Sequence, residues 1–160
     1  MAPQPTTEHF ENLLATELLK LNPQQPLWLE DESINIGRAQ LPKPFYDQMQ
    51  EKPTIVMDVP RPERVRKLAQ EYCQTDKIVL ETAILKIQKR LGGLATKEAI
   101  GAVATGDMEK MVDIVLAYYD KAYSFEVDKK KHVLPLKLQT IDPEENAAQI
   151  LQFAKNNNLL

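Results

Sequence analysis

Apolar side chains recur at helical spacing along most of this chain, which predicts a helix-rich fold. The clearest stripe runs from Met108 to Tyr119, because its apolar residues fall on one face of a helix. Capping residues and glycines then set the expected limits of each helix. The predicted helices span residues 6–21, 42–51, 60–73, 76–91, 96–106, 107–123 and 142–155.

Three short apolar segments do not follow helical spacing and predict β-strands. They cover residues 27–30, 54–59 and 133–141, and long helical segments separate them. Strands that alternate with helices in this way form a parallel sheet with helices on its faces. The predicted fold class is therefore α/β, with a three-layer parallel sheet flanked by helices. Three strands are few for such a sheet, and a β-α unit missing before residue 1 would explain the shortage.

Composition and charge predict one soluble globular domain over residues 1–160. Hydrophobic residues make up 43% of the chain and charged residues 27%, and the formal net charge is −3. A negative net charge restricts attraction to nucleic acid to a local basic patch. No apolar run is long enough to cross a bilayer, and residues 1–5 form a proline-rich lead-in rather than a secretory signal. The single cysteine, Cys73, suits a cytoplasmic location.

An acidic cluster follows the first predicted strand. Glu30, Asp31 and Glu32 come directly after Leu27-Trp28-Leu29, as the acids of a Walker B strand do. Since ligands of parallel α/β sheets bind beyond the carboxyl ends of the strands, these carboxylates are candidates to hold the water shell of a magnesium ion or to orient a nucleophile. The alternative, that they begin a solvated loop, fits the local pattern equally well. The five glycines form no phosphate loop, so the expected domain is an incomplete P-loop nucleoside triphosphatase-like domain.

Two groups of cations are candidates for binding phosphate. Arg61 and Arg64 begin the helix after the second strand, at a spacing that lets both point the same way. Lys86, Lys89 and Arg90 lie on one face of the next helix, as basic residues do in the helical lid of a nucleotide kinase. Residues 76–123 are accordingly predicted to be a lid-like helical segment. An ordinary solvated surface is the competing interpretation of both groups.

Three tyrosines near the end of the long helix are candidates for a pocket wall. Tyr118, Tyr119 and Tyr123 have rings that stack on a base or pack against an isoprenoid-like chain. The alternative is that Tyr119 belongs to the core while the other two form hydrogen bonds at its edge. The run Lys129-Lys130-Lys131 is expected to be a solvated turn. Cys73 is expected to be a small half-buried residue rather than a nucleophile.

Several of these segments occur together, in the same order, in one enzyme family. The chain resembles tRNA 2-selenouridine synthase from about Pro3 to Tyr123, and more weakly to its end. The specific pair of blocks is Trp28–Arg38 and Arg90-Leu91-Gly92-Gly93. All shared blocks are Phe10–Leu14, Pro26–Ser33 with Ile36–Arg38, Asp58–Arg61 with Glu63 and Arg64, Lys89–Gly93, and Tyr118–Asp120 with Tyr123.

The resemblance implies a role in tRNA modification. Members of the family carry a rhodanese-like domain with a catalytic cysteine, followed by a P-loop domain, and convert the wobble 2-thiouridine of tRNA to 2-selenouridine. They attach a geranyl group from geranyl diphosphate and then replace the sulfur with selenium from selenophosphate. This chain resembles only the P-loop domain after its phosphate loop, and Cys73 is not in the motif of the catalytic cysteine. The reaction is therefore not expected of these residues alone.

The ligands implied for the whole enzyme are tRNA, geranyl diphosphate and selenophosphate, with magnesium accompanying the diphosphate. A single pocket is expected, in which acids and cations meet and the tyrosines form the wall; no catalytic residue is assigned. The residues expected to bind phosphate or tRNA are Arg38, Arg61, Arg64, Lys86, Lys89 and Arg90. A nucleotide kinase or ATPase relative, and a non-catalytic interaction module, are the alternatives. An exposed sheet edge would also favour self-association.

Overall fold

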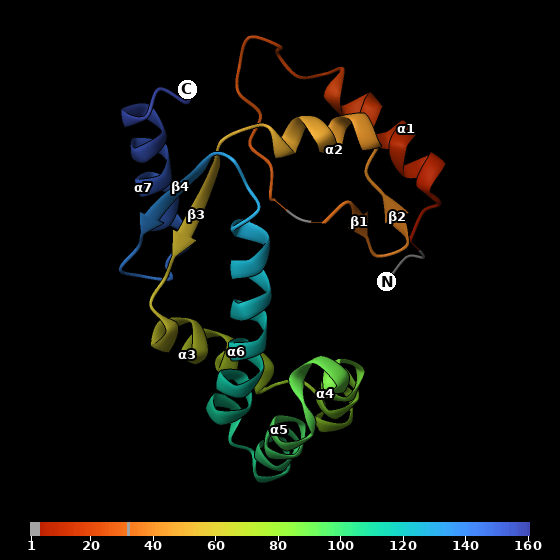
Figure 1. The fold of residues 1–160 in the computed structure, drawn as a ribbon, viewed down its shortest axis with the longest axis vertical. Helices are drawn as coiled ribbons and strands as arrows, with labels where there is room; N and C mark the ends of the chain where they lie inside the picture. Colours follow the sequence, from red (N-terminus) through yellow and green to blue (C-terminus); the bar gives the residue numbers. More distant parts are fainter. Residues whose placement is uncertain (1–3, 32) are drawn as a thin grey trace. The chain divides into compact units, whose positions relative to one another are not determined.

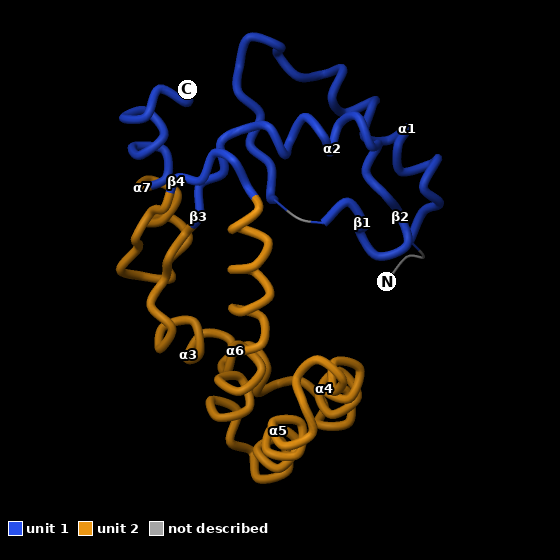
Figure 2. Tube along the Cα trace, in the orientation of Figure 1, with its two compact units in different colours: residues 1–56, 130–134, 150–160 blue, residues 57–129, 135–149 orange. Residues whose placement is uncertain are grey.

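The computed structural model describes residues 4–31 and 33–160 of the chain (Figure 1). Glu32, one of the three predicted acids, lies outside the described residues. The chain divides into two compact units, which are treated separately below (Figure 2). Unit 1 comprises Met1–Val56, Lys130–Leu134 and Ile150–Leu160, and unit 2 comprises Met57–Lys129 and Pro135–Gln149. That the 160 residues act as one domain, with residues 76–123 as a lid, stays a prediction.

Short elements make up most of unit 1. Helix α1 (Thr7–Leu18) begins as predicted, since the Thr6 hydroxyl accepts a hydrogen bond from the His9 amide at 3.3 Å. Strands β1 (Asn35–Ile36) and β2 (Ala39–Gln40) pair as an antiparallel hairpin. Gly37 supplies the positive φ of 64° that the tight turn requires. Helix α2 (Lys43–Gln50) follows the hairpin.

The strand predicted at residues 27–30 is wrong. Residues 26–31 belong to no helix or strand, and Leu27, Trp28 and Leu29 are exposed to 47%, 47% and 46%. An apolar run favours extended backbone, but a strand exists only where a neighbouring strand takes up its hydrogen bonds. Glu30 and Asp31 therefore lie in an irregular segment rather than at the end of a strand.

Two longer strands, β3 (Thr54–Asp58) and β4 (Val133–Lys137), form the second sheet. The Thr54 amide donates to the His132 carbonyl at 2.8 Å, and the Leu138 amide donates to the Asp58 carbonyl at 2.9 Å. Because both strands advance together between these bonds, they are parallel, and the mixed α/β class is confirmed. The strands of the described residues make two two-stranded sheets, so the three-layer sheet and the P-loop fold are not confirmed.

Unit 2 contains four complete helices, and helix α7 (Pro143–Asn156), which follows β4, begins in unit 2 and ends in unit 1. The four are α3 (Arg61–Tyr72), α4 (Lys77–Leu91), α5 (Gly93–Thr105) and α6 (Met108–Val127). The predicted caps Asp76, Asp107 and Asp142 accept hydrogen bonds from amides of the first helical turn. Gly92 ends α4 with a φ of 90°, and α5 begins directly after it, earlier than the predicted Thr96.

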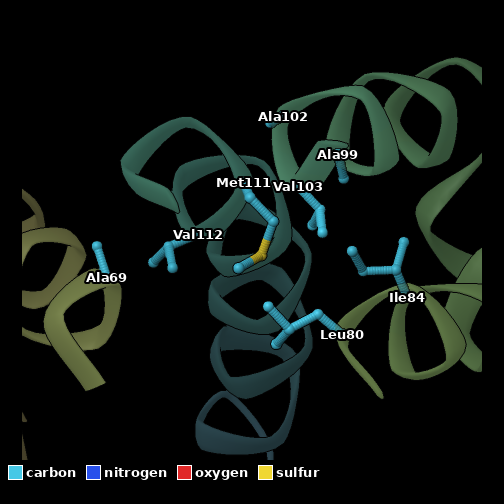
Figure 3. Close-up of a cluster of buried hydrophobic side chains, with 8 residues drawn as sticks. All are labelled: Ala69, Leu80, Ile84, Ala99, Ala102, Val103, Met111 and Val112. Atoms are coloured by element: carbon cyan, nitrogen blue, oxygen red, sulfur yellow. The ribbon is translucent and has the colours of Figure 1, made fainter. Parts of the chain in front are cut away.

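The hydrophobic core of unit 2 joins these four helices around the first half of α6. Its buried members are Ala69, Leu80, Ile84, Ala99, Ala102, Val103, Met111 and Val112. Figure 3 shows Val112 directed toward Ala69 of α3, and Met111 toward the side chains of α4 and α5. Helix α6 therefore has two flanks, with α3 on one and α4 on the other. None of the described helices is both long and apolar enough to span a bilayer.

Candidate nucleic-acid interface

The flank of α6 that faces α3 carries Arg64 in a bidentate ion pair. Arg64 lies in the first turn of α3, and its Nη1 and Nη2 donate to the two carboxylate oxygens of Asp120 on α6, at 2.6 and 2.9 Å. Its Nε donates to the Val59 carbonyl at 3.2 Å. Three donors of the guanidinium are thus taken up within unit 2, in the planar geometry that arginine and carboxylate share.

This ion pair is half-buried and changes the pKa of both partners. The hydrogen bond from Arg64 lowers the pKa of the Asp120 carboxyl below its usual value, although burial opposes the change. The same hydrogen bond raises the pKa of Arg64, again against burial. Both groups are therefore held in their charged forms at neutral pH.

Arg61 is paired on the same flank. Its Nε donates to Asp113 Oδ1 at 2.7 Å, its Nη2 donates to the Asp113 carbonyl at 2.7 Å, and its Nη1 lies 3.9 Å from the Asp120 carboxylate. A hollow of about 280 Å³ opens beside it. The hollow is lined by Arg61, Pro62, Val65, Arg66, Glu109 and Asp113. Two arginines and two acids leave this lining without net charge, so it does not by itself favour a phosphate.

The opposite flank of α6 has cations without acidic partners. Lys86, Lys89 and Arg90 are exposed on α4, and none of them forms an ion pair with any described residue. Arg90 Nη1 donates to the Tyr118 hydroxyl of α6 across a long 3.4 Å contact, which raises the pKa of Arg90. The structure therefore brings the predicted basic row and one predicted tyrosine together. We call Lys86, Lys89, Arg90 and Tyr118 the α4 cation face.

The other two predicted tyrosines lie further along α6, and at 100° per residue Tyr123 is about 140° around the helix from Tyr118. The rings of Tyr118 and Tyr119 are tilted by 58° with centroids 5.1 Å apart. Tyr119 is 43% exposed, so it is not the core residue of the alternative interpretation, and Tyr123 is also exposed. Lys121, which sequence reasoning missed, follows Tyr118 by one helical turn and adds an exposed cation on the same side. Its spacing from Tyr118 was the available signal.

In unit 1, the acid Asp31 is engaged by a lysine. Lys130 Nζ lies 2.8 Å from Asp31 Oδ1 and 2.6 Å from Oδ2, and it donates to Gln50 Oε1 at 2.9 Å. The Lys130 side chain is only 11% exposed. The solvated turn predicted at residues 129–131 is therefore wrong at its centre. Lys129 and Lys131 also form ion pairs, each at 2.7 Å, with Glu126 and Glu51.

A magnesium site does not fit the described acids. An ammonium at 2.6 Å from Asp31 takes the position in which a cation would meet that carboxylate. No group of three histidine, cysteine, aspartate or glutamate side chains lies together in residues 4–31 and 33–160. Glu30 is exposed, and no ion pair is formed by it within the same ranges.

Arg38, the remaining predicted cation, sits in the β1–β2 turn of unit 1. Its amide donates to Gln4 Oε1 at 2.8 Å, and the Gln4 amide nitrogen donates to the Ile36 carbonyl. The Arg38 side chain is exposed and has no acidic partner in the described part of the chain. The predicted binding roles of Arg38 and of the other cations stay predictions.

Comparison with known proteins places this arrangement in a family. The sequence model of the family described as "tRNA 2-selenouridine synthase AAA domain" matches residues 1–157. The chain belongs to this family. The resemblance seen in the sequence is thereby confirmed over nearly the whole chain.

Relatives named tRNA 2-selenouridine synthase match the same region. The protein of Shewanella frigidimarina is 36% identical over an alignment that covers 81% of this chain and 44% of that protein. Those of Shewanella piezotolerans and Aeromonas salmonicida are 33% and 31% identical, covering 80% of this chain and 44% and 43% of theirs. The chain thus spans less than half the length of these relatives. No solved structure matches it.

Proposed function

We propose that this chain is the part of a tRNA-modifying enzyme that binds tRNA through the α4 cation face. The observation that carries the proposal is the difference between the two flanks of α6. Arg61 and Arg64 are neutralised by carboxylates, whereas Lys86, Lys89 and Arg90 are exposed and have no acidic partner among the described residues. Unpaired cations release counterions when they meet phosphates, which is the main source of affinity for nucleic acid.

The neighbouring tyrosines support RNA as the ligand. Unpaired bases of RNA stack on aromatic side chains, and Tyr118, Tyr119 and Tyr123 lie on the helix that Arg90 contacts. A net charge of −3 for the chain means that attraction must come from such a local patch. The α4 cation face, extended by Lys121, provides one.

For the whole enzyme we propose the activity that gives the relatives their name, tRNA 2-selenouridine synthesis. In that reaction a cytoplasmic tRNA exchanges the sulfur of wobble 2-thiouridine for selenium through a geranylated intermediate, with geranyl diphosphate and selenophosphate as substrates. We infer that the 160 residues bind tRNA without carrying out the reaction. Self-association through an open edge of the β3–β4 pair belongs to the same proposal, because such an edge leaves backbone groups unpaired.

The test measures how tightly the 160-residue chain binds fluorescently labelled tRNA. The fluorescence anisotropy of the tRNA reports binding, and it is recorded at salt concentrations between 50 and 200 mM. The triple variant Lys86→Gln, Lys89→Gln, Arg90→Gln is expected to bind about tenfold more weakly at the middle of this range. The slope of log Kd against log salt should also fall by about 2–3, because about one counterion is released per lost phosphate contact.

A matched control removes the same charge elsewhere. Lys97, Lys110 and Lys155 are exposed and form no ion pair with a described residue, so their triple change to glutamine lowers the net charge equally. The control should keep both affinity and salt slope close to wild type. Equal losses in the two triple variants would show non-specific attraction and would contradict the assignment to the α4 cation face. The same samples, given geranyl diphosphate and thiolated tRNA, should yield no geranylated product.

A further inference from the structure

Within unit 1, the segment that bears the predicted acids is contacted by one lysine whose side chain is largely shielded from solvent. We propose that Lys130 is a positioning residue, which holds the acid-bearing segment Leu27–Asp31 in place through Asp31. The segment has no strand partner, and its three apolar residues are half-exposed. No strand hydrogen bonds therefore fix its backbone, and among the described residues the ion pair of Asp31 links it to a residue distant in the sequence.

The geometry of Lys130 supports this role. Its Nζ lies within 2.9 Å of three oxygens, two on Asp31 and one on Gln50. Three oxygens match the three N–H donors of an ammonium. At 11% exposure, the Lys130 side chain is far less accessible than Lys131, which is 65% exposed in its own pair with Glu51. Asp31 is 30% exposed, so the pair is only partly shielded, but losing a partner costs a shielded charge more than it costs a charge in an exposed pair.

Gln50 gives a second, independent observation. Its Oε1 accepts from Lys130, and this fixes the orientation of the amide. Its Nε2 is buried and has no hydrogen-bond partner among the described residues. A buried donor without a partner is unfavourable, so the amide is held this way because its oxygen is needed by the ammonium. The last residue of helix α2 thereby helps to position the Lys130 ammonium that binds Asp31.

The two described acids therefore have different roles. Asp31 is occupied by Lys130 and anchors the segment, whereas Glu30, one residue earlier, stays exposed and available to a ligand. The consequence for a substrate rests on the proposed function, but the anchoring itself does not involve tRNA. It is therefore tested without tRNA, so its failure and a failure of the binding experiment are distinguishable.

Trp28, the only tryptophan, reports on the segment directly. Fluorescence anisotropy and quenching by acrylamide, a neutral quencher, are compared for wild type, Lys130→Met and Lys131→Met. In Lys130→Met the quenching constant should rise about twofold and the anisotropy should fall, because the segment loses its anchor. Lys131→Met removes the same charge one residue away and should stay near wild type. Lys130→Arg, which keeps the charge and donors, should recover most of the wild-type signal.

Two outcomes would overturn the proposal. One is unchanged Trp28 quenching in Lys130→Met, and the other is an equal change in Lys131→Met. If circular dichroism shows that Lys130→Met does not fold, Asp31→Asn tests the proposal instead. Quenching of Trp28 must then rise in Asp31→Asn in the same way. The exchanged pair Asp31→Lys with Lys130→Asp should lower the quenching again. A failure of this double variant to improve on Asp31→Lys alone would also count against a direct pair.

Discussion

The two flanks of helix α6 carry similar cations in different electrostatic settings. On the α3 flank, Arg61 and Arg64 meet Asp113 and Asp120 at 2.6–2.9 Å. On the α4 flank, Lys86 and Lys89 face solvent with no acidic partner in the described residues, and Arg90 contacts only a tyrosine hydroxyl. Helical spacing of cations thus indicates that they share a face. Whether they are available to a ligand is decided by residues on another helix.

The difference teaches which part of unit 2 is structural and which is open to partners. A bidentate arginine–carboxylate pair fixes α3 against α6 and adds to the packing of Ala69 on Val112. A row of solvated cations adds nothing comparable to stability. Substitutions on the first flank should therefore change folding, and substitutions on the second should change binding.

The largest expected effect is on stability at the first flank. Arg64→Met leaves Asp120 half-buried with only a distant contact to Arg61, so the free energy of unfolding should fall by about 1–2 kcal/mol. Urea unfolding followed by circular dichroism measures the loss. Arg66→Met is the matched control, because its pair with Glu63 is exposed, and it should change stability by less than about 0.5 kcal/mol. A similar loss in both variants would remove the distinction between the flanks.

The next effect is the acid response of the same pair. Because Arg64 lowers the pKa of Asp120 in the folded state, the pair stabilises fully above the unfolded-state pKa of about 3.9 and is lost as the pH falls through the lower native value. Between about pH 5 and pH 3, wild type should lose stability more steeply than Asp120→Asn, which has no carboxylate to protonate. Parallel urea-unfolding curves for the two proteins over that range would refute the coupling.

A smaller effect is expected when the α3 flank is made more positively charged, like the α4 flank. Asp113→Asn removes the carboxylate that pairs with Arg61 and raises the net charge beside the hollow by one, while the bond from Arg61 to the main-chain carbonyl of residue 113 stays. Affinity for labelled tRNA should rise about two- to threefold, with a salt slope larger by up to about 1. Glu126→Gln makes the same charge change on α6 away from that hollow and serves as the control. An unchanged affinity in Asp113→Asn would show that the α3 flank does not face the RNA.

The smallest effect concerns the contact between Arg90 and Tyr118. At 3.4 Å and in solvent it is weak, so Tyr118→Phe should change the free energy of unfolding by less than about 0.5 kcal/mol and leave tRNA affinity intact. Tyr118→Ala removes the ring and should weaken binding by about 1 kcal/mol or more if a base stacks there. Equal binding by the phenylalanine and alanine variants would exclude stacking at this position.

Sequence reasoning located most helices, because their limits depend on neighbours in the chain. Asp76, Asp107 and Asp142 cap as predicted, and Gly92 and Gly106 end helices with positive φ. The strand at residues 27–30 was wrong because pairing depends on distant backbone. The β1–β2 hairpin was missed, although Gly37 between Ile36 and Arg38 marked a tight turn.

The candidate site was predicted only as far as one helix face at a time. The basic row of α4 and the tyrosines of α6 were found from spacing, and the structure joins the two groups through Arg90 and Tyr118. The partners of Arg61 and Arg64 lie more than fifty residues away in the sequence, as does the partner of Lys130. Local patterns carry no information about such pairs, since the fold alone brings them together.

Cys73 is exposed directly after α3 rather than half-buried as predicted, and this has a practical consequence for spectroscopy. It is the only cysteine of the chain and lies in unit 2, whereas the only tryptophan, Trp28, lies in unit 1. A maleimide dye on the unaltered protein would therefore label one defined atom. Energy transfer from the indole to that dye then gives a distance ruler between the units, and titrating tRNA against it would follow any rearrangement in real time.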